Sequence, residues 1–277
     1  MSCLVSVIIP NFNYGRYIAQ AVESVLAQDY KEIEIIVVDD GSTDNSLEVL
    51  SKFDSRITLI KNSNWGASIA RNFGLMCAKG ELIAYLDADD FWLPTKISSQ
   101  IELMKEAKVD LVYCQMKVLD EKGQTTWDST KSKSGNFRGD YLKNPASTPF
   151  APSTVLMSRR LVALAGIWDS SMKSPSEDFD YFRRCSKFTD FTAIEEALVI
   201  HRDHSGSLTA GSLKKYFLDN RLAVRKMFSD EYPEISAYQI RLCWIKLHYS
   251  FFKSFLKVHD FSGATQCLLS CFSPSYY

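Results

Sequence analysis

The sequence predicts an α/β protein with a mostly parallel sheet, helices on both faces of that sheet, and a helical C-terminal extension. Over residues 1–115, short apolar runs rich in Val and Ile alternate with segments whose apolar residues recur at helical spacing. The runs are continuously apolar, as in strands that are buried on both faces of a parallel sheet. From about residue 213 onward the chain is mostly helical in pattern, with few turn residues.

Strands and helices are expected to alternate along the first part of the chain. We expect strands at residues 5–9, 33–38, 57–60, 81–86 and 109–113. We expect helices at residues 17–27, after the N-cap candidate Asp44, at 67–78 and at 94–106. Pro10 ends the first strand because proline lacks a backbone N–H, and Gly80 marks the end of the third helix.

The chain is organised differently after residue 115. Residues 120–123 are expected to form a turn between two short strands. A further helix is expected to begin near Ser174, with Ser174 as N-cap, Pro175 in the first helical position and Glu177 closing a capping box. We therefore expect a domain of residues 1–210, which consists of the halves 1–115 and 116–210. A helical region of residues 211–277 follows it.

The composition excludes several classes of protein. The chain has 32 Lys and Arg against 33 Asp and Glu, which argues against a nucleic-acid-binding domain and against a highly charged disordered protein. The longest apolar runs are far shorter than the roughly 20 residues that span a bilayer, and no basic segment precedes the first of them. The seven cysteines form no CxxC pair, so we expect reduced thiols in the cytoplasm.

Polar loops follow four of the expected strands. They comprise residues 10–14, 39–44, 62–66 and 87–90. Since the carboxyl ends of parallel strands meet at one edge of the sheet, where ligands bind in open α/β folds, we expect these loops to form a site. For any single loop a solvated turn is the alternative.

The loop after the fourth strand contains three carboxylates, Asp87, Asp89 and Asp90. Their charges would repel each other unless a cation lay among them. Mg²⁺ and Mn²⁺ prefer oxygen ligands and often bridge carboxylates to phosphates. We therefore expect a metal site that holds a diphosphate, with acids that cap the helix before Pro94 as the alternative.

Four segments resemble the family 2 glycosyltransferases of GT-A fold, in the order and at the spacing usual for that family. They are VSVIIPNFN at 5–13, VVDDGSTD at 37–44, NWGASIARNFG at 64–74 and LDADD at 86–90. The resemblance implies a GT-A fold with a Rossmann-like nucleotide-binding sheet, a donor of nucleotide-sugar type, Mn²⁺ or Mg²⁺, and inversion at the anomeric carbon. Residues 1–115 would then bind the nucleotide sugar and residues 116–210 the acceptor.

The resemblance assigns donor-binding residues to these loops. They are Pro10, Phe12, Asn13, Asp40, Arg71 and Asp87. Asp40 would accept a hydrogen bond from a uracil-type N–H, whereas Asp39 would support the loop. Arg71 would meet the ribose and diphosphate, which suits a guanidinium, and a salt bridge on the helix face is the alternative. Asp89 is the first choice as metal ligand, and Asp87 would touch ribose or metal-bound water.

The acids Glu177 and Asp178 resemble the family's catalytic-base motif, in which the second acid is the base. The resemblance therefore implies Asp178 as the catalytic base, and the alternative is that both acids only complement the helix dipole. His204 and Ser207 belong to a cluster similar to the family segment that closes over the diphosphate or the metal. A turn histidine is the alternative for His204.

The implied function is a metal-dependent inverting glycosyltransferase, of hexosyl or N-acetylhexosaminyl type. It would move a sugar from a UDP-sugar to a hydroxyl of a saccharide or lipid-linked saccharide, in bacterial-type polysaccharide or glycolipid assembly. A non-catalytic nucleotide-sugar-binding partner subunit is the alternative. A dinucleotide-binding oxidoreductase is disfavoured because Pro-Asn-Phe-Asn replaces a Gly-rich loop after the first strand.

The charge is distributed unevenly. Residues 211–277 carry a net charge of +4 and residues 1–210 a net charge of −5. The C-terminal region is also aromatic, with apolar residues at helical spacing in 240–257. Packing on the catalytic domain or a homo-oligomer contact is one expectation, and a peripheral contact with the inner face of a membrane is the other.

Overall fold

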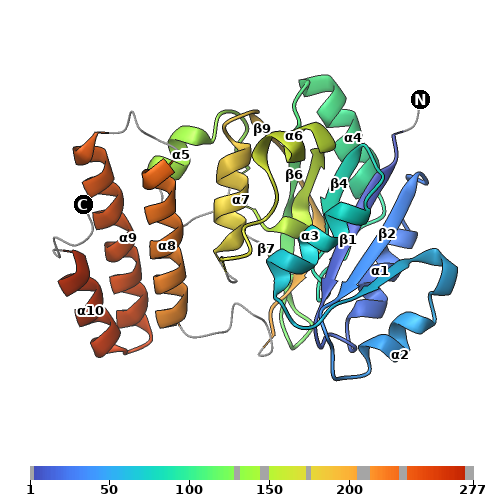
Figure 1. Cartoon of the computed structure of the whole chain (residues 1–277), viewed down its shortest axis with the longest axis horizontal. Helices are drawn as coiled ribbons and strands as arrows, with labels where there is room; N and C mark the ends of the chain where they lie inside the picture. The colour runs from blue at the N-terminus through green and yellow to red at the C-terminus, as the bar shows by residue number, and fades with distance from the viewer. Residues whose placement is uncertain are drawn as a thin grey trace.

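A computed structural model describes residues 3–127, 132–143, 150–172, 176–204, 213–230 and 236–271. It shows one twisted sheet with helices on both faces and three further helices at the end of the molecule opposite β2 (Figure 1). The α/β fold class and the C-terminal helices are therefore confirmed. None of the helices among these residues is both long and apolar enough to cross a membrane.

Among the residues described above, the sheet has nine strands, with the order β3-β2-β1-β4-β8-β6-β9-β5 and β7 paired to β6. The strands are β1 Val5–Asn11, β2 Ile33–Asp39, β3 Thr58–Lys61, β4 Leu82–Tyr85, β5 Phe91–Trp92, β6 Leu111–Leu119, β7 Thr125–Trp127, β8 Val155–Ser158 and β9 Phe191–Arg202. The first four strands are parallel, as expected. The expected fourth and fifth strands are not neighbours, because β8 lies between them and pairs antiparallel with both.

In the described part of the chain, ten α-helices connect or follow these strands. They are α1 Ile18–Leu26, α2 Ser46–Ser51, α3 Ala67–Cys77, α4 Lys96–Ala107, α5 Arg138–Lys143, α6 Arg159–Ala165, α7 Glu177–Cys185, α8 Leu213–Asp230, α9 Ala237–Lys257 and α10 Phe261–Cys271. The expected turn at residues 120–123 joins β6 to β7, and Gly123 donates its N–H to the carbonyl of Asp120.

The two faces of the sheet form two cores. The face with Ile8, Ile83 and Tyr85 packs against α3, α6 and α7, and the face with Val7 and Ala84 packs against α1, α2 and α4. This alternation along each strand is the period-2 pattern of a sheet that is covered on both sides.

Two expected element boundaries are wrong. β1 continues through Pro10 to Asn11. Proline has no backbone N–H to donate, but β4 ends opposite Ile8, so Pro10 has no neighbouring strand residue on that side of β1 that would need this donor. Helix α7 begins at Glu177 with Ser176 in the N-cap position, where Ser174 was expected. Ser174 and Pro175 lie outside the described residues.

The C-terminal helices share a core with the rest of the molecule. Phe217 of α8 and Trp244, Phe251 and Phe255 of α9 are buried in the same cluster as Phe179 of α7. The expected packing of this helical region on the remainder of the chain is thereby confirmed.

Candidate functional site

Hydrogen bonds join the loops that follow β1 and β2. Asn11 and Asp39 end these strands opposite each other, and the Asn11 side chain donates to Asp39 Oδ2 at 2.7 Å. Asp39 also accepts from the N–H and the hydroxyl of Ser42, so it supports its own loop. Asn13 has a φ of 59°, which asparagine tolerates, and its side-chain oxygen accepts the Thr43 N–H at 2.7 Å. Asn13 therefore holds the first loop against the second.

The loop after β2 is also joined to the loop after β3. The buried Asp40 donates its N–H to the Asn11 carbonyl, which places it beside Pro10 and Phe12. Its carboxylate accepts from the backbone N–H of Trp65 at 2.9 Å and of Gly66 at 2.7 Å. The structure thus brings together the expected nucleobase residues, and it gives Asp40 a role in shaping the third loop that the sequence did not indicate.

Arg71 connects the two halves of the domain. It projects from α3, where Gly74 allows close packing on β1, since an added Cβ would lie 2.3 Å from Ile8 Cγ2. The buried Arg71 guanidinium donates to Asp87 Oδ1 at 2.9 Å and to Glu177 Oε1 at 3.2 Å. It also lies 4.6 Å from the centre of the Trp168 ring. Arg71 thus does form salt bridges, as in the alternative to a donor contact, and they lie between α3, the loop after β4, and α7.

Asp89 is a buried carboxylate beside an imidazole. It follows β4, and its Oδ2 lies 3.2 Å from Nε2 of His204, at the end of β9. Burial, followed by the negative charges of Asp90 and Asp87, raises the pKa of Asp89 to about 6. The ring of His204 lies 4.9 Å from the ring of Tyr17. A carboxylate oxygen and an imidazole nitrogen thus face each other at the position where the sequence predicts the metal.

Asp90 has partners of its own within the protein. One carboxylate oxygen accepts the Ser153 hydroxyl at 2.6 Å and the other lies 2.9 Å from His201 Nδ1. Burial lowers the pKa of His201, but the hydrogen bond to Asp90 and the nearby carboxylates outweigh it and raise this pKa to about 9. Ser153 had not been singled out from the sequence, and nothing in the sequence linked His201 to Asp90. The only signal for them was that a buried acid needs hydrogen-bond donors.

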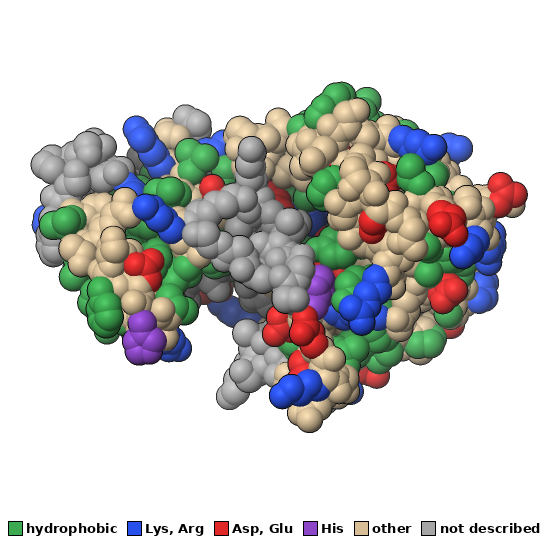
Figure 2. Space-filling model, turned by 90° about the horizontal axis from the view of Figure 1, so that it is seen from below, with side chains coloured by type: hydrophobic (Ala, Val, Ile, Leu, Met, Phe, Trp, Pro, Cys, Tyr) green, Lys and Arg blue, Asp and Glu red, His purple; other side chains and the backbone are tan. Residues whose placement is uncertain are grey.

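Asp87 and Ser207 are two further residues expected in the site. Asp87 pairs with Arg71, and among the described residues no group of three or more His, Cys, Asp or Glu side chains gathers as in a complete metal site. Ser207 lies outside the described residues. Figure 2 views the molecule from below and shows histidine and acidic side chains near the middle of this face.

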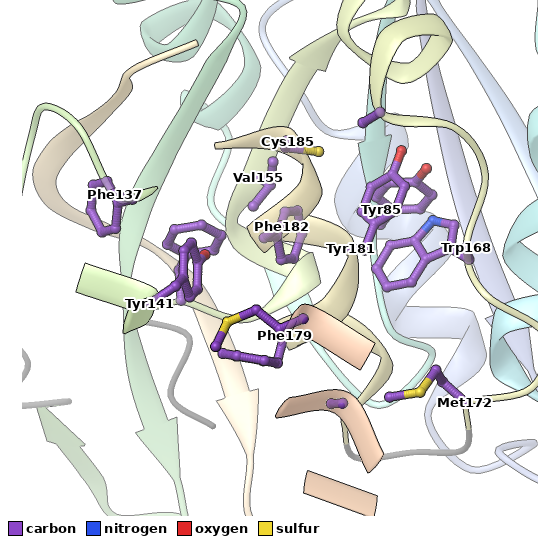
Figure 3. Close-up of a cluster of buried hydrophobic side chains, with 14 of the residues drawn as sticks. Tyr85, Phe137, Tyr141, Val155, Trp168, Met172, Phe179, Tyr181, Phe182 and Cys185 are labelled. Carbon is purple, nitrogen blue, oxygen red and sulfur yellow. The ribbon is translucent and has the colours of Figure 1, made fainter. Parts of the chain in front are cut away.

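Helix α7 positions Asp178. Phe179 and Phe182 are buried in an aromatic cluster, and Tyr181 stacks on Trp168 with ring centres 4.2 Å apart (Figure 3). These contacts fix α7, whereas Asp178 in its first turn is only half-buried and accepts the N–H of Phe179. Asp178 is therefore a rigidly mounted carboxylate that remains accessible.

The loops after β1 to β4, the buried Arg71 and the acids of α7 all come from the sequence motifs described above, and these motifs follow one another in the order usual for the family that the sequence resembles. The sequence profile described as "Glycosyl transferase family 2" matches residues 6–164. The chain belongs to this family.

A relative of this family 2 chain has a more specific name. Over 112 residues this chain is 51 % identical to "UDP-Glc:alpha-D-GlcNAc-diphosphoundecaprenol beta-1,3-glucosyltransferase WfaP" of Escherichia coli. The aligned segment covers 40 % of this chain and 45 % of that protein. The chain spans about half the length of the curated relatives it matches at this level.

Solved structures show the same fold at low sequence identity. Residues 1–349 of S. aureus TarS in complex with UDP-GlcNAc superpose with a TM-score of 0.70 at 19 % identity, covering 97 % of this chain and 80 % of that chain. The mannosyltransferase PcManGT of Pyrobaculum calidifontis, in complex with GDP-Man and Mn²⁺, has a TM-score of 0.64 at 17 % identity, covering 100 % and 77 %. These similarities confirm the GT-A fold.

Proposed function

We propose that this chain is an inverting glycosyltransferase that moves a hexosyl or N-acetylhexosaminyl group from a UDP-sugar to an acceptor hydroxyl. The observation that carries this proposal is the buried bridge from Asp87 through Arg71 to Glu177. It joins the loop expected to hold the donor diphosphate to the helix that bears Asp178. One site therefore contains the groups for donor binding and a carboxylate suited to act as base.

The comparisons support a UDP-sugar and a lipid-linked acceptor. One structural neighbour was solved with UDP-GlcNAc, and one relative is named for UDP-Glc and a diphosphoundecaprenol acceptor. Pro10, Phe12 and Asp40 would receive the nucleobase, with Asn13 fixing their loop. The acceptor would be a saccharide or lipid-linked saccharide in bacterial-type surface polysaccharide or glycolipid assembly, handled in the cytoplasm.

The residues around Asp89 fit Mn²⁺ or Mg²⁺. The raised pKa of Asp89 shows a buried carboxylate without a full counter-charge, and His204 offers a nitrogen ligand suited to Mn²⁺. A neighbour of the same fold contains Mn²⁺. Asp89 and His204 would hold the ion, with Asp87 beside them. Such an ion supplies positive charge that stabilises a leaving nucleoside diphosphate.

Asp178 would remove the proton from the acceptor hydroxyl. The N-terminal end of α7 favours the ionised carboxylate, so Asp178 can accept a proton at neutral pH. As the proton moves to Asp178, the acceptor oxygen bonds to the anomeric carbon and the bond to the diphosphate breaks on the opposite face. The configuration at the anomeric carbon is thereby inverted.

Replacement of the proposed base tests this function. Asp178→Asn keeps the shape of the side chain but removes its basicity, so transfer is expected to fall by a factor of about 10² to 10⁴. Donor affinity, measured by calorimetry with UDP-sugar and Mn²⁺, is expected to stay at the parent value. The control is Asp190→Asn, at an exposed position outside the site.

Two results would change the conclusion. Transfer by Asp178→Asn at the parent rate would refute the assignment of the base. A parent protein that binds UDP-sugar but neither transfers nor hydrolyses it with Mn²⁺ would instead be a non-catalytic nucleotide-sugar-binding subunit.

A further inference from the structure

Helix α9 has a second apolar face in addition to the one that it buries. Its inner face carries Trp244, Leu247, Phe251 and Phe255, which pack into the core with Phe217 of α8. A helix that needed only this packing would be polar elsewhere. The remaining surface of α9 instead contains both polar side chains and a row of apolar ones.

The outer face of α9 carries exposed apolar residues that recur alternately four and three residues apart. The residues of this outer stripe are Tyr238, Leu242, Ile245, Tyr249, Phe252 and Leu256. Phe252 is half-buried, and the side chains of the other five are between 37 % and 70 % exposed. Residues at this spacing line up along one side of a helix. The outer stripe is therefore a continuous apolar face.

Basic residues flank the outer stripe. Arg241, Lys246 and Lys253 are each adjacent in sequence to a stripe residue, Lys257 follows the last one, and α9 contains no Asp or Glu. Lys253 Nζ lies 4.7 Å from the centre of the Tyr249 ring. Figure 2 shows hydrophobic and basic side chains side by side on the surface of the C-terminal helices.

This charge pattern decides which kind of surface fits the outer stripe. In a two-helix seam between two copies of α9, the flanking positions would bring basic residues against basic residues, which destabilises such a pair. An anionic lipid surface pairs with the lysines and arginine, while the apolar side chains enter the boundary between headgroups and acyl chains. We infer that α9 docks through its outer stripe onto the surface of an anionic lipid bilayer.

The docked helix would lie in the plane of the membrane surface, with its inner face still packed on α8. Tyr216 of α8 lies 5.3 Å, between ring centres, from Phe251 on that inner face of α9. The docking itself does not depend on the proposed transferase activity.

Vesicle flotation of the full chain tests the inference. One set of vesicles is pure phosphatidylcholine and the other contains phosphatidylglycerol as well, both at physiological ionic strength. The fraction bound to the anionic vesicles is expected to be at least about tenfold higher, and to fall as salt is added.

Matched variants assign the binding to the outer stripe. The double variants Ile245→Ser with Tyr249→Ser and Arg241→Glu with Lys253→Glu change α9 outside its buried face, and each is expected to lower binding to anionic vesicles at least tenfold. Controls at exposed positions on other helices are Met76→Ser on α3 and Lys105→Glu on α4, which are expected to bind as the parent does. Circular dichroism verifies that all variants remain folded.

Three outcomes would overturn the inference. The first is a parent protein that binds neither kind of vesicle, or both equally. The second is equal loss of binding in the control and α9 variants. The third is a parent dimer, detected by sedimentation equilibrium, that Ile245→Ser with Tyr249→Ser dissociates, because the outer stripe would then be a contact between two copies.

Discussion

Asp89 is held in an environment that disfavours its ionised form. The side chain is buried, and two further carboxylates lie near it, so its pKa rises to about 6 from an ordinary value of 3.8. At neutral pH the carboxylate is still mostly ionised, and the folded protein carries the cost of that buried charge. A cation that binds here removes part of the cost, which links metal binding to stability.

Asp89→Ala is expected to separate these two effects. The variant should lose the Mn²⁺-dependent part of UDP-sugar binding, measured by calorimetry with and without the metal. Without metal it should be at least as stable as the parent in thermal unfolding at pH 7, since the repelling charge is gone. Glu106→Ala, at an exposed position of α4, is the control. Unchanged metal-dependent affinity in Asp89→Ala would show that the ion binds elsewhere.

Glu177 was expected to close a capping box, and the structure instead pairs it with Arg71. Glu177→Gln keeps the shape of the side chain but weakens a buried charge-assisted hydrogen bond. The free energy of unfolding is expected to fall by about 2 kcal/mol, because bonds to charged groups contribute about 1.5 to 3 kcal/mol. Urea denaturation measures this change against Glu102→Gln, which is exposed on α4. A loss equal to that of the control would show that the bridge contributes nothing to stability.

Helix α4 contains a lysine in its buried face. Lys96 Nζ donates to Gln100 Oε1 at 2.7 Å and lies 4.0 Å from the centre of the Trp92 ring. Burial lowers the pKa of Lys96 from 10.5 to about 8. Below pH 8 the lysine is protonated in both the folded and the unfolded state, and the folded state carries the cost of the buried charge. Between pH 8 and 10.5 only the unfolded state keeps the proton, so stability rises with pH.

Lys96→Met is therefore expected to stabilise α4 at neutral pH. Removal of the buried charge is expected to raise the free energy of unfolding at pH 7 by about 3 kcal/mol, which corresponds to the pKa shift. Loss of the hydrogen bond to Gln100 lowers it by about 1 kcal/mol, so the net gain is about 2 kcal/mol. The gain should shrink between pH 8 and 10.5 and then change sign. Urea denaturation across this range measures it. A variant whose stability relative to the parent does not vary with pH would contradict the assignment of the shift to Lys96.

Of the two cores, the one on the face of the sheet with Ile8 and Tyr85 continues through α7 to α8 and α9. The aromatic cluster in Figure 3 belongs to this core, which also contains Phe217 and Phe251. Because this core contains side chains from both sides of the expected division at residue 210, we expect the C-terminal helices to unfold together with the sheet. The division at that residue therefore separates parts of the sequence that are packed as one body.

Phe251→Ala tests the cooperativity of the whole molecule. Removing a buried phenylalanine costs about 3 to 5 kcal/mol, so the single calorimetric transition expected for the parent should move as a whole to lower temperature. Phe261→Ala, at a 66 % exposed position of α10, should leave the transition in place. A parent or variant that melts in two separate transitions would show that the C-terminal helices are an independent unit.

The sequence by itself determined the parallel strands β1 to β4, the loops at their carboxyl ends, and the helical C-terminus. These features depend on neighbours in the chain, namely apolar periodicity and the polar residues that follow each strand. The family motifs are local in the same sense. The boundaries at Pro10 and α7 were missed because they depend on where another strand ends and on which partner Glu177 finds.

Only the tertiary structure decided the partners of the buried charges. Arg71 lies 16 residues from Asp87 and 106 from Glu177, and His204 lies 115 residues from Asp89. No local pattern encodes such pairs, since a buried charge is satisfied by whichever group the fold brings within reach. The same holds for α9, whose sequence showed apolar helical spacing. Only the packing on α8 and α10 showed which apolar face is buried and which is left at the surface.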